Sequence, residues 1–382
     1  MSTPTAPAAP PELALDPGEI AAWRAFSQGL WGERPATPME VFEQLGAVQS
    51  QEIHSSKLTP AMRAGPEADG SYTPVESVDA LIEDGSVVRT HVLRPTWHTV
   101  PVGKLRMMLA ATADRVGRAL ASMTRGRGLS EDTLARCDQA LADATAGGRH
   151  LTREEAHSAL VDAGVPEPTN QQMIYILMHA ELAGAICSGT PRGRQQTYAN
   201  FDERVPARTV DREEAIRELA CCFFASRGPA TLKDFSRWAS LKAADAQAAI
   251  TGLELNAARI DGRVCYFADE PPPPRDGGPR VDFVQGWDEM LCSYTDSKDW
   301  VLHASVPRAD FPARPRFNSV ILLDGQVIGY WKATLTKRRV EFATYRLRGF
   351  TAAEIAAMRR GADRLRRWYG REEMELGLER AR

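Results

Sequence analysis

The chain has 382 residues, of which 43% are apolar and 25% are charged, and its formal net charge is −3. This length allows two or three domains with cores of their own, and the composition excludes disorder of the whole chain. The nearly neutral charge excludes a uniformly basic nucleic-acid binder, so contact with a polyanion would require a local basic face.

The chain is expected to be a soluble, cytoplasmic protein. No stretch approaches the roughly 20 uninterrupted apolar residues of a membrane helix, and the start lacks a signal-peptide pattern. Residues 1–17 are rich in Pro and Ala and are expected to be a disordered tail. We assign no metal and no cofactor, and expect free, buried thiols, because no CxxC pair or zinc spacing occurs among the six cysteines, Cys137, Cys187, Cys221, Cys222, Cys265 and Cys292.

Residues 16–100 are predicted to form helices followed by a pair of strands. Apolar residues at helical spacing predict a helix within 16–31, and a second helix after Pro38 with Val41, Leu45 and Val48 facing inward. The chain then breaks into Pro, Gly and Ser before a third helix capped by Ser77. Residues 87–93 and 96–100 alternate as paired strands would. This order is typical of a winged helix.

The same order returns twice. In the second copy, Thr152 with Glu155 predicts a helix start, a further helix covers 171–183, and 185–198 forms a wing. In the third copy, helices are expected at 211–226, after Thr231 and over 242–253, with a wing over 258–267. The predicted fold class is therefore α+β, with three tandem winged-helix domains.

A stiff Pro/Gly linker separates these copies from a C-terminal β-rich segment. That segment contains a hairpin at Asp324-Gly325 and a final helix over 352–369, followed by a charged tail. The hairpin is a candidate for insertion into a DNA minor groove, with its orientation left open. The predicted boundaries are 1–17 (tail), 18–125, 126–205 and 206–270 (winged helices), 271–279 (linker) and 280–382 (C-terminal region).

Two polar motifs are candidates for chemistry. Gln49 and Gln51 lie two apart, so they face the same way only if the backbone is extended or the helix is ending. Taken alone, the pair is more typical of a solvated helix end. Thr96 and His98 bracket Trp97 in a predicted strand and should share one face, although a lone His is commonly structural.

Basic clusters are candidates for contact with phosphates. The wing tip and the 337–339 cluster are the stronger candidates, whereas the last helix is more typical of a solvated face, because acidic residues lie near its arginines. The expected DNA contacts are Arg94, Arg192, Arg194, Lys337, Arg338 and Arg339, and a weaker cluster is Arg314 with Arg316.

Standard catalytic signatures are missing from the sequence. It contains no GxGxxG, Walker loop, HExxH or GxSxG motif. The adjacent Asp288 and Glu289 could supply a carboxylate base, but two neighbouring residues seldom point at the same centre.

Together these segments resemble the bacterial winged-helix DNA glycosylases that excise bulky alkylated purines and unhook interstrand crosslinks, including the azinomycin-resistance type. The resemblance is carried, from about residue 18 to the final helix, by LGAVQSQ at 45–51, LRPTWHTVP at 93–101, GPATLKDF at 228–235, GWDE at 286–289 and LDGQV at 323–327.

The resemblance implies a C-shaped scaffold around duplex DNA with the Gln pair on its concave side. It assigns catalysis to Gln49 and Gln51 and supporting roles to Thr96 and His98. Relatives carry Gln or Asp at the second position of the pair. With Gln51 at that position, this chain is similar to the resistance-type enzymes, which have a narrower substrate range. The expected partner is double-stranded DNA with alkylated purines, bound by a monomer associated with the nucleoid.

Glutamine chemistry narrows the substrate. Glutamine cannot take a proton at neutral pH, but it can orient a water molecule. That suffices when the leaving purine is already cationic, as N7 alkylation makes it, because no general acid is then needed. A monofunctional glycosylase for N7-alkylated purines is the main hypothesis, in DNA repair or in self-resistance to a genotoxin. The alternatives are a winged-helix transcriptional regulator and a damage-binding protein without catalysis.

Overall fold

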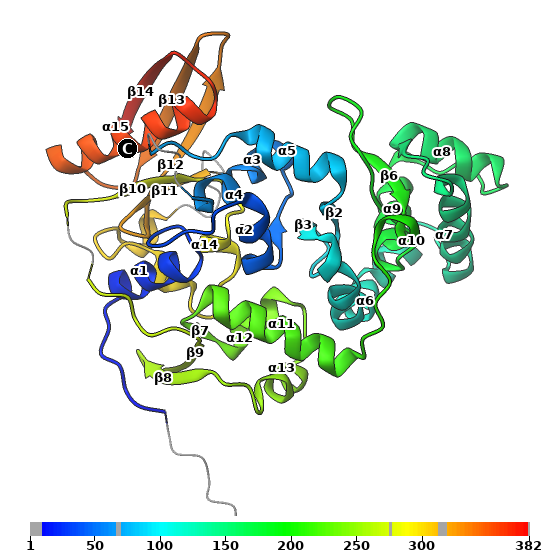
Figure 1. Ribbon diagram of the computed structural model, residues 1–382, viewed down its shortest axis with the longest axis horizontal. Helices are drawn as coiled ribbons and strands as arrows, with labels where there is room; N and C mark the ends of the chain where they lie inside the picture. Colours follow the sequence, from blue (N-terminus) through cyan, green and yellow to red (C-terminus); the bar gives the residue numbers. More distant parts are fainter. Residues whose placement is uncertain (1–9, 66–69, 275–276, 312–318, 381–382) are drawn as a thin grey trace, which may run out of the picture.

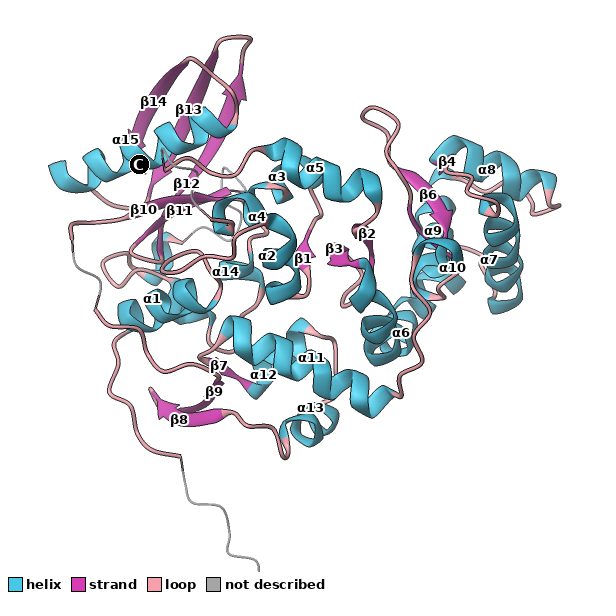
Figure 2. Ribbon diagram, viewed as in Figure 1, coloured by secondary structure: helices cyan, strands magenta, loops and turns pink. Residues whose placement is uncertain are grey.

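A computed structural model of the chain describes residues 10–65, 70–274, 277–311 and 319–380. Over these residues the fold is mixed α/β, with three three-stranded sheets and one five-stranded sheet (Figures 1 and 2). Within them, no helix combines the length and the apolar character needed to cross a membrane. Arg314 and Arg316 lie outside the described residues.

The first unit is built around the sheet β1-β3-β2. Its elements are α1 (Pro17–Ser27), α2 (Pro38–Leu45), β1 (Val48–Gln49), α3 (Ile53–Ser56), α4 (Leu58–Arg63), α5 (Val75–Asp84), β2 (Val87–His91), β3 (Trp97–Pro101) and α6 (Val102–Arg125). The helix α2 was expected to include Val48, but it stops at Leu45 because Gly46 adopts a left-handed φ of +71°. Gln49 is therefore a strand residue.

The second and third units contain the sheets β4-β6-β5 and β7-β9-β8. The second comprises α7 (Glu131–Thr145), β4 (Leu151–Thr152), α8 (Arg153–Asp162), α9 (Asn170–Leu182), β5 (Ile186–Ser188), β6 (Thr197–Asn200) and α10 (Phe201–Arg204). The third comprises α11 (Arg212–Arg227), β7 (Ala230–Thr231), α12 (Leu232–Trp238), α13 (Ala243–Ile250), β8 (Asn256–Ile260) and β9 (Arg263–Phe267). The capping boxes at Thr152 and Thr231 hold the starts of α8 and α12.

All three units repeat one order of elements: a helix, a short strand, further helices and a pair of strands. In each sheet the last strand of the unit lies in the middle, so the short strand pairs with it. This arrangement positions the site, because the short strand β1 carries Gln49 and the middle strand β3 carries His98.

The C-terminal region forms the five-stranded sheet β10-β11-β12-β13-β14. Its elements are β10 (Val281–Val284), α14 (Glu289–Cys292), η1 (Lys298–Val301), η2 (Arg308–Asp310), β11 (Ser319–Leu323), β12 (Gln326–Leu335), β13 (Arg339–Arg346), α15 (Ala352–Trp368) and β14 (Glu373–Arg380). The expectation of a charged tail after the last helix is wrong for residues 373–380. These residues form strand β14, which pairs in parallel with β13. The reason is the alternation of Met374, Leu376 and Leu378, which pack against the core, with polar neighbours.

The hairpin turn at Asp324-Gly325 is present but faces the protein. Both residues have positive φ, +46° and +85°, as a tight two-residue turn requires. A Cβ atom placed on Gly325 would lie 3.0 Å from the backbone of Ala21 in α1. Helix α1 therefore covers this turn. The turn is not exposed for insertion into a DNA groove, contrary to the expectation from the sequence.

Part of the expected N-terminal tail is also ordered. Leu13 N–H donates to the Arg259 carbonyl over 2.9 Å, and Arg259 N–H donates to the Pro11 carbonyl over 2.7 Å. Leu13 and Leu15 pack against the cluster that contains Trp23. Residues 10–16 thus lie along β8, while 1–9 are outside the described residues. In the expected linker, 271–274 and 277–279 contain no helix or strand, and 275–276 are not described.

The hydrophobic core is divided unevenly. One cluster joins the first unit, the third unit and the C-terminal sheet, with members such as Leu105, Phe223 and Phe283. The second unit has a cluster of its own around Leu141 and Ile176. The second unit is thus a lobe with a core of its own, to the right in Figure 1, while its Cys187, Phe201 and Val205 also pack into the shared cluster.

Candidate active site

The two polar motifs expected from the sequence meet across one pair of strands. In the antiparallel register of β1 and β3, Gln49 lies opposite His98 and Val48 lies opposite Thr99. Directly opposed residues place their side chains on the same face of a sheet. Gln49 and His98 are both buried, at 4% and 0% exposure.

Arg94 joins these two side chains. Its Nη2 donates to Gln49 Oε1 over 2.7 Å and lies 3.2 Å from His98 Nε2. Since a guanidinium has only donors, Gln49 must present its oxygen to Arg94, and His98 Nε2 must be an acceptor. The His98 proton is then on Nδ1, which donates to the Thr96 carbonyl over 2.9 Å. One cation therefore sets both the amide orientation and the imidazole tautomer.

His98 is neutral in this setting. Its burial, and next the nearby charge of Arg94, hold the pKa of His98 well below its usual 6.5. The imidazole is therefore not a general acid at neutral pH, and both of its ring nitrogens are engaged, Nε2 with Arg94 and Nδ1 with the Thr96 carbonyl.

The side chains of Thr96 and Gln51 form no described hydrogen bond with Gln49 or His98, although the sequence grouped all four residues in one candidate site. Thr96 lies just before β3, and its backbone carbonyl, not its hydroxyl, contacts His98. Its Oγ1 is buried and has no partner among the described residues. Gln51 lies after β1, and its side chain is exposed. The structure thus brings Gln49, His98 and Arg94 together and leaves the Gln51 amide facing solvent.

Arg89 holds the backbone around Gln51. Its Nε donates to the Ser50 carbonyl over 2.9 Å, and its Nη2 lies 3.4 Å from the Gln51 carbonyl. The guanidinium also stacks on Trp97, 4.1 Å from the ring centroid, and bonds Gln196 of the second unit. The end of β1 is therefore tied to the second lobe.

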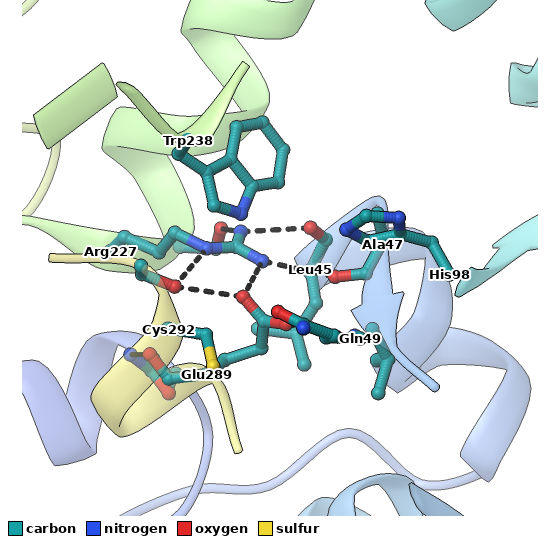
Figure 3. Close-up of polar contacts among 12 residues, drawn as sticks. Leu45, Ala47, Gln49, His98, Arg227, Trp238, Glu289 and Cys292 are labelled. Carbon is teal, nitrogen blue, oxygen red and sulfur yellow. Dashed lines mark hydrogen bonds and ion pairs between the residues drawn. The ribbon is translucent and has the colours of Figure 1, made fainter. Parts of the chain in front are cut away.

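A buried ion pair that the sequence did not reveal as functional lies behind Gln49 (Figure 3). Glu289 Oε1 accepts from the Gln49 N–H over 3.0 Å, and Oε2 accepts from Arg227 Nη2 over 2.9 Å. Both side chains are fully buried. Burial alone would raise the pKa of Glu289, but Arg227 and Arg94 outweigh it and hold the pKa below its usual 4.5. Glu289 is thus a carboxylate with both oxygens occupied.

One sequence signal could have identified Arg227. It follows Leu219 and Phe223 at i+4 steps on the buried face of α11, where an apolar residue would be expected. Glu289 gave only the weak hypothesis of a carboxylate base. The two adjacent acids diverge, since Asp288 forms a separate buried pair with Arg63, Nη2 to Oδ1 over 2.7 Å.

The expected DNA contacts other than Arg94 lie on the surface. Arg192 pairs with Glu155, and Arg194 is exposed with no partner among the described residues. Arg338 in the β12–β13 turn pairs with Glu372, and Arg339, the first residue of β13, pairs with Glu375 of β14. Lys337 is exposed without a described partner. Arg94, in contrast, is largely buried and engaged with Gln49.

Metal chemistry has no candidate among the described residues, where no group of three or more His, Cys, Asp or Glu side chains is placed to hold an ion. The six cysteines are free thiols. Cys137, Cys187 and Cys265 are buried, whereas Cys221 is exposed.

Comparison with known proteins gives a consistent match. The family model described as DNA glycosylase AlkZ-like matches residues 42–368, a range that contains both polar motifs. The interstrand DNA cross-link repair glycosylase of Streptomyces sahachiroi is 25% identical over 336 residues, covering 82% of this chain and 87% of that protein. The solved structure of Streptomyces sahachiroi DNA glycosylase AlkZ matches with a TM-score of 0.77 and 20% identity, over 97% of this chain and all of that one.

Proposed function

We propose, since this chain belongs to the AlkZ-like DNA glycosylase family, that it hydrolyses the N-glycosidic bond of bulky N7-alkylated purines and unhooks interstrand crosslinks built on them. The chain is a DNA glycosylase by family, and its curated relative is named for crosslink repair. On this proposal it is a monofunctional enzyme that acts as a monomer on cytoplasmic, nucleoid DNA, in repair or in self-resistance to a genotoxin.

The observation that carries the proposal is the neutral, oriented pair of Gln49 and His98. Breaking the glycosidic bond produces an oxocarbenium-like sugar and requires a water molecule to attack it. Gln49 Oε1 has two lone pairs, one of which accepts from Arg94. The other can accept a hydrogen bond from the attacking water and so orient it. As the new C–O bond forms, the C–N bond breaks, the cationic purine leaves as a neutral base, and the water proton is lost to solvent.

Among the described residues that contact this pair, neither His98 nor Glu289 is placed to act as a strong acid or base. The pKa of His98 is held too low for it to carry a proton at neutral pH, and both oxygens of Glu289 are occupied. The leaving base must therefore depart without protonation, and an N7-alkylated purine does so because it is already cationic. Undamaged bases are expected to remain in place.

Gln51 is proposed to contact the substrate directly. Its side chain is exposed while its carbonyl lies beside Arg89. Such an amide can bond the sugar or the flanking phosphate of a lesion that stays in the duplex. The buried Thr96 hydroxyl is proposed to support the same face.

The three repeated units are proposed to be winged helices arranged as a C around duplex DNA. The basis is their common element order, with the last strand in the middle of each sheet. Arg194 and Lys337 are exposed and free to bind phosphates, while Arg192, Arg338 and Arg339 would have to exchange an acidic partner for a phosphate.

The test is base release from DNA that carries N7-alkylguanine, measured as abasic sites. Wild type should release the adducted base, and Gln49→Ala and Gln51→Ala should release it more slowly by a factor on the order of a hundred or more. Wild type that binds this DNA but forms no abasic sites would refute the proposal and favour a damage-binding protein. Unchanged rates in both variants would move the active site elsewhere.

A transcriptional regulator is not favoured. A regulator would need a dimer and a palindromic site, and it would give the bridge from Arg94 to Gln49 and His98 no task.

A further inference from the structure

The strand that carries Gln49 has an open edge. β1 is only two residues long and lies at the edge of the sheet β1-β3-β2. The Ser50 N–H donates to the Trp97 carbonyl in β3, so the backbone groups of Ala47 and Gln49 face away from β3. Buried backbone groups at such an edge need partners.

The ion pair Arg227–Glu289 supplies these partners. Arg227 donates to the carbonyls of Leu45 over 2.8 Å and of Ala47 over 3.1 Å, while Glu289 accepts from the Gln49 N–H over 3.0 Å (Figure 3). A guanidinium thus offers donors to the carbonyls, and a carboxylate offers an acceptor to the amide, as a neighbouring strand would. Trp238 covers the guanidinium at 4.5 Å.

We infer that Arg227 and Glu289 are positioning residues for Gln49: together they replace a missing neighbouring strand and fix the peptide plane from which the Gln49 amide projects. This inference rests on the proposed glycosylase function. It concerns alignment and not proton transfer, because neither side chain has a free polar group facing His98 or Gln49 Oε1. A rotation of this peptide would move Gln49 Oε1 away from Arg94 and from the attacking water.

The two residues come from distant parts of the chain. Arg227 ends α11 of the third unit, and Glu289 begins α14 of the C-terminal region. Ser293 Oγ donates to Glu289 Oε2 over 2.8 Å and accepts from Arg227 Nε over 2.8 Å, so the pair is fixed from both sides. The alignment of Gln49 thereby depends on the docking of three parts of the molecule.

The neighbouring pair Arg63–Asp288 provides a matched control. It is equally buried and lies one residue away, but its described partners are Gln28, Thr59 and the Met290 N–H at the start of α14, and none of them lies in β1. An Asn at position 288 can still accept from that N–H, so the cap of α14 is kept. Asp288→Asn and Glu289→Gln each neutralise one buried carboxylate at nearly constant volume. In Glu289→Gln, a single amide oxygen must serve either Arg227 or the Gln49 N–H, so one of them loses its acceptor.

The experiment measures melting temperature, affinity for N7-alkylguanine DNA, and the single-turnover rate of base release at saturating enzyme. Both variants should melt lower than wild type. Glu289→Gln should release base more slowly by a factor on the order of ten to a hundred, with affinity retained, because a small misplacement of a reacting group has such an effect. Asp288→Asn should keep the wild-type rate at temperatures where it is folded.

A second variant covers the case in which a lone buried charge prevents folding. The double variant Arg227→Met/Glu289→Leu removes both charges at similar volume, a type of change that often preserves stability. Because it leaves the Leu45 and Ala47 carbonyls and the Gln49 N–H without these partners, it should melt lower than wild type. At temperatures where it is folded, it should bind DNA but release base as slowly as Glu289→Gln. Equal rates for Glu289→Gln, Asp288→Asn and wild type, or a fully active double variant, would overturn the inference. A wild type that binds but releases no base would instead refute the proposed function itself.

Discussion

Arg94 is the residue whose expected role differs most from its position. The sequence placed it among the DNA contacts, yet it is largely buried and its Nη2 donates to Gln49 Oε1. Replacing it with Met would leave Gln49 Oε1 and His98 Nε2 without their common donor. The two roles therefore lead to different outcomes when Arg94 is changed.

For Arg94→Met we expect base release to slow by a factor on the order of ten to a hundred, through loss of alignment. Affinity for undamaged DNA should stay close to that of wild type. Binding measured over a series of salt concentrations separates the alternatives, because loss of a phosphate contact would reduce the salt slope by about one. A reduced slope with an unchanged rate of base release would restore the DNA-contact hypothesis.

His98 makes a prediction about pH. Because the pKa of His98 is well below 6.5, it stays neutral across the range in which a free histidine titrates. The rate of base release should therefore show no step near pH 6.5 in a profile from about pH 6 to pH 8. A fall in rate with an apparent pKa close to 6.5 would contradict the neutral, hydrogen-bonding role.

At the scale of residues, the sequence predicted part of the candidate site, whose catalytic role stays a prediction. Gln49 and His98 were found as motifs, and the alternation of the strand residues was enough to place His98. The partners Arg94, Arg227 and Glu289 could not be assigned, because their roles depend on contacts between segments far apart in the chain. No local periodicity encodes such contacts.

Among the elements, the turn Asp324-Gly325 tests how closely α1 and the C-terminal sheet are packed. Gly325→Ala places a Cβ 3.0 Å from the Ala21 backbone at φ +85°. Gly262→Ala is the matched control, since Gly262 has φ +73° but nothing within 4 Å of the added atom. Both variants should lose about 1–2 kcal/mol from the left-handed backbone. Gly325→Ala should lose about 1–3 kcal/mol more from overpacking, measured by denaturant unfolding.

Equal losses in the two glycine variants would show that α1 yields at this contact. The comparison needs no activity assay, so it is independent of the proposed function.

The β5–β6 hairpin of the second unit carries two arginines with different surroundings. Arg194 is exposed, whereas Arg192 pairs with Glu155 over 2.7 Å. Arg194→Ala should weaken DNA binding at every sequence and reduce the salt slope by about one. Arg192→Ala should weaken DNA binding less than Arg194→Ala, because Arg192 must give up its ion pair with Glu155 before it can contact a phosphate. If Arg192→Ala weakened DNA binding more than Arg194→Ala, the ion pair between Arg192 and Glu155 would have to open when DNA binds.

The elements were predicted well where local signals are strong. The helices that begin after Thr152 and Thr231, the strand pairs β5–β6 and β8–β9, and the Asp324-Gly325 hairpin follow from caps, alternation and turn residues. The expected cap at Ser77 is wrong, because α5 already begins at Val75 after Pro74 and Ser77 lies inside it. The end of α2 was missed because the left-handed conformation of Gly46 was not recognised as a stop. The strand β14 was missed because its glutamates concealed the alternation of Met374 and Leu376.

On the scale of the whole molecule, buried carboxylates join the units. Asp234 of α12 accepts from the backbone of Thr295 and Asp296 over 2.7 and 2.8 Å. Burial would raise the pKa of Asp234, but Arg24 and these hydrogen bonds outweigh it and hold the pKa below 3.8. Glu289 behaves likewise relative to 4.5. The docking of the third unit and the C-terminal region therefore relies on ionised acids.

These depressed pKa values predict acid sensitivity. Their stabilisation is fully present above the unfolded values of 3.8 and 4.5, and it is lost as the pH falls through the lower folded values. Melting temperatures should therefore drop steeply below about pH 4.5. In Asp234→Asn this acid-dependent drop should be smaller, although the variant starts from a lower melting temperature. An identical drop would assign the acid sensitivity to other groups.

The length of helix α6 has a geometric consequence for how the second unit is placed against the first. Its 24 residues begin directly after β3 and end where the second unit begins, so it is a spacer of about 36 Å. Each residue inserted within it would turn everything beyond by about 100° around the helix axis, but would lengthen it by only about 1.5 Å. Because Met178 and Leu182 of the second unit pack on Val116 and Leu120 of α6, such an insertion would separate these two faces. The placement of the second unit beside Gln51 therefore depends on the length of α6 in whole residues.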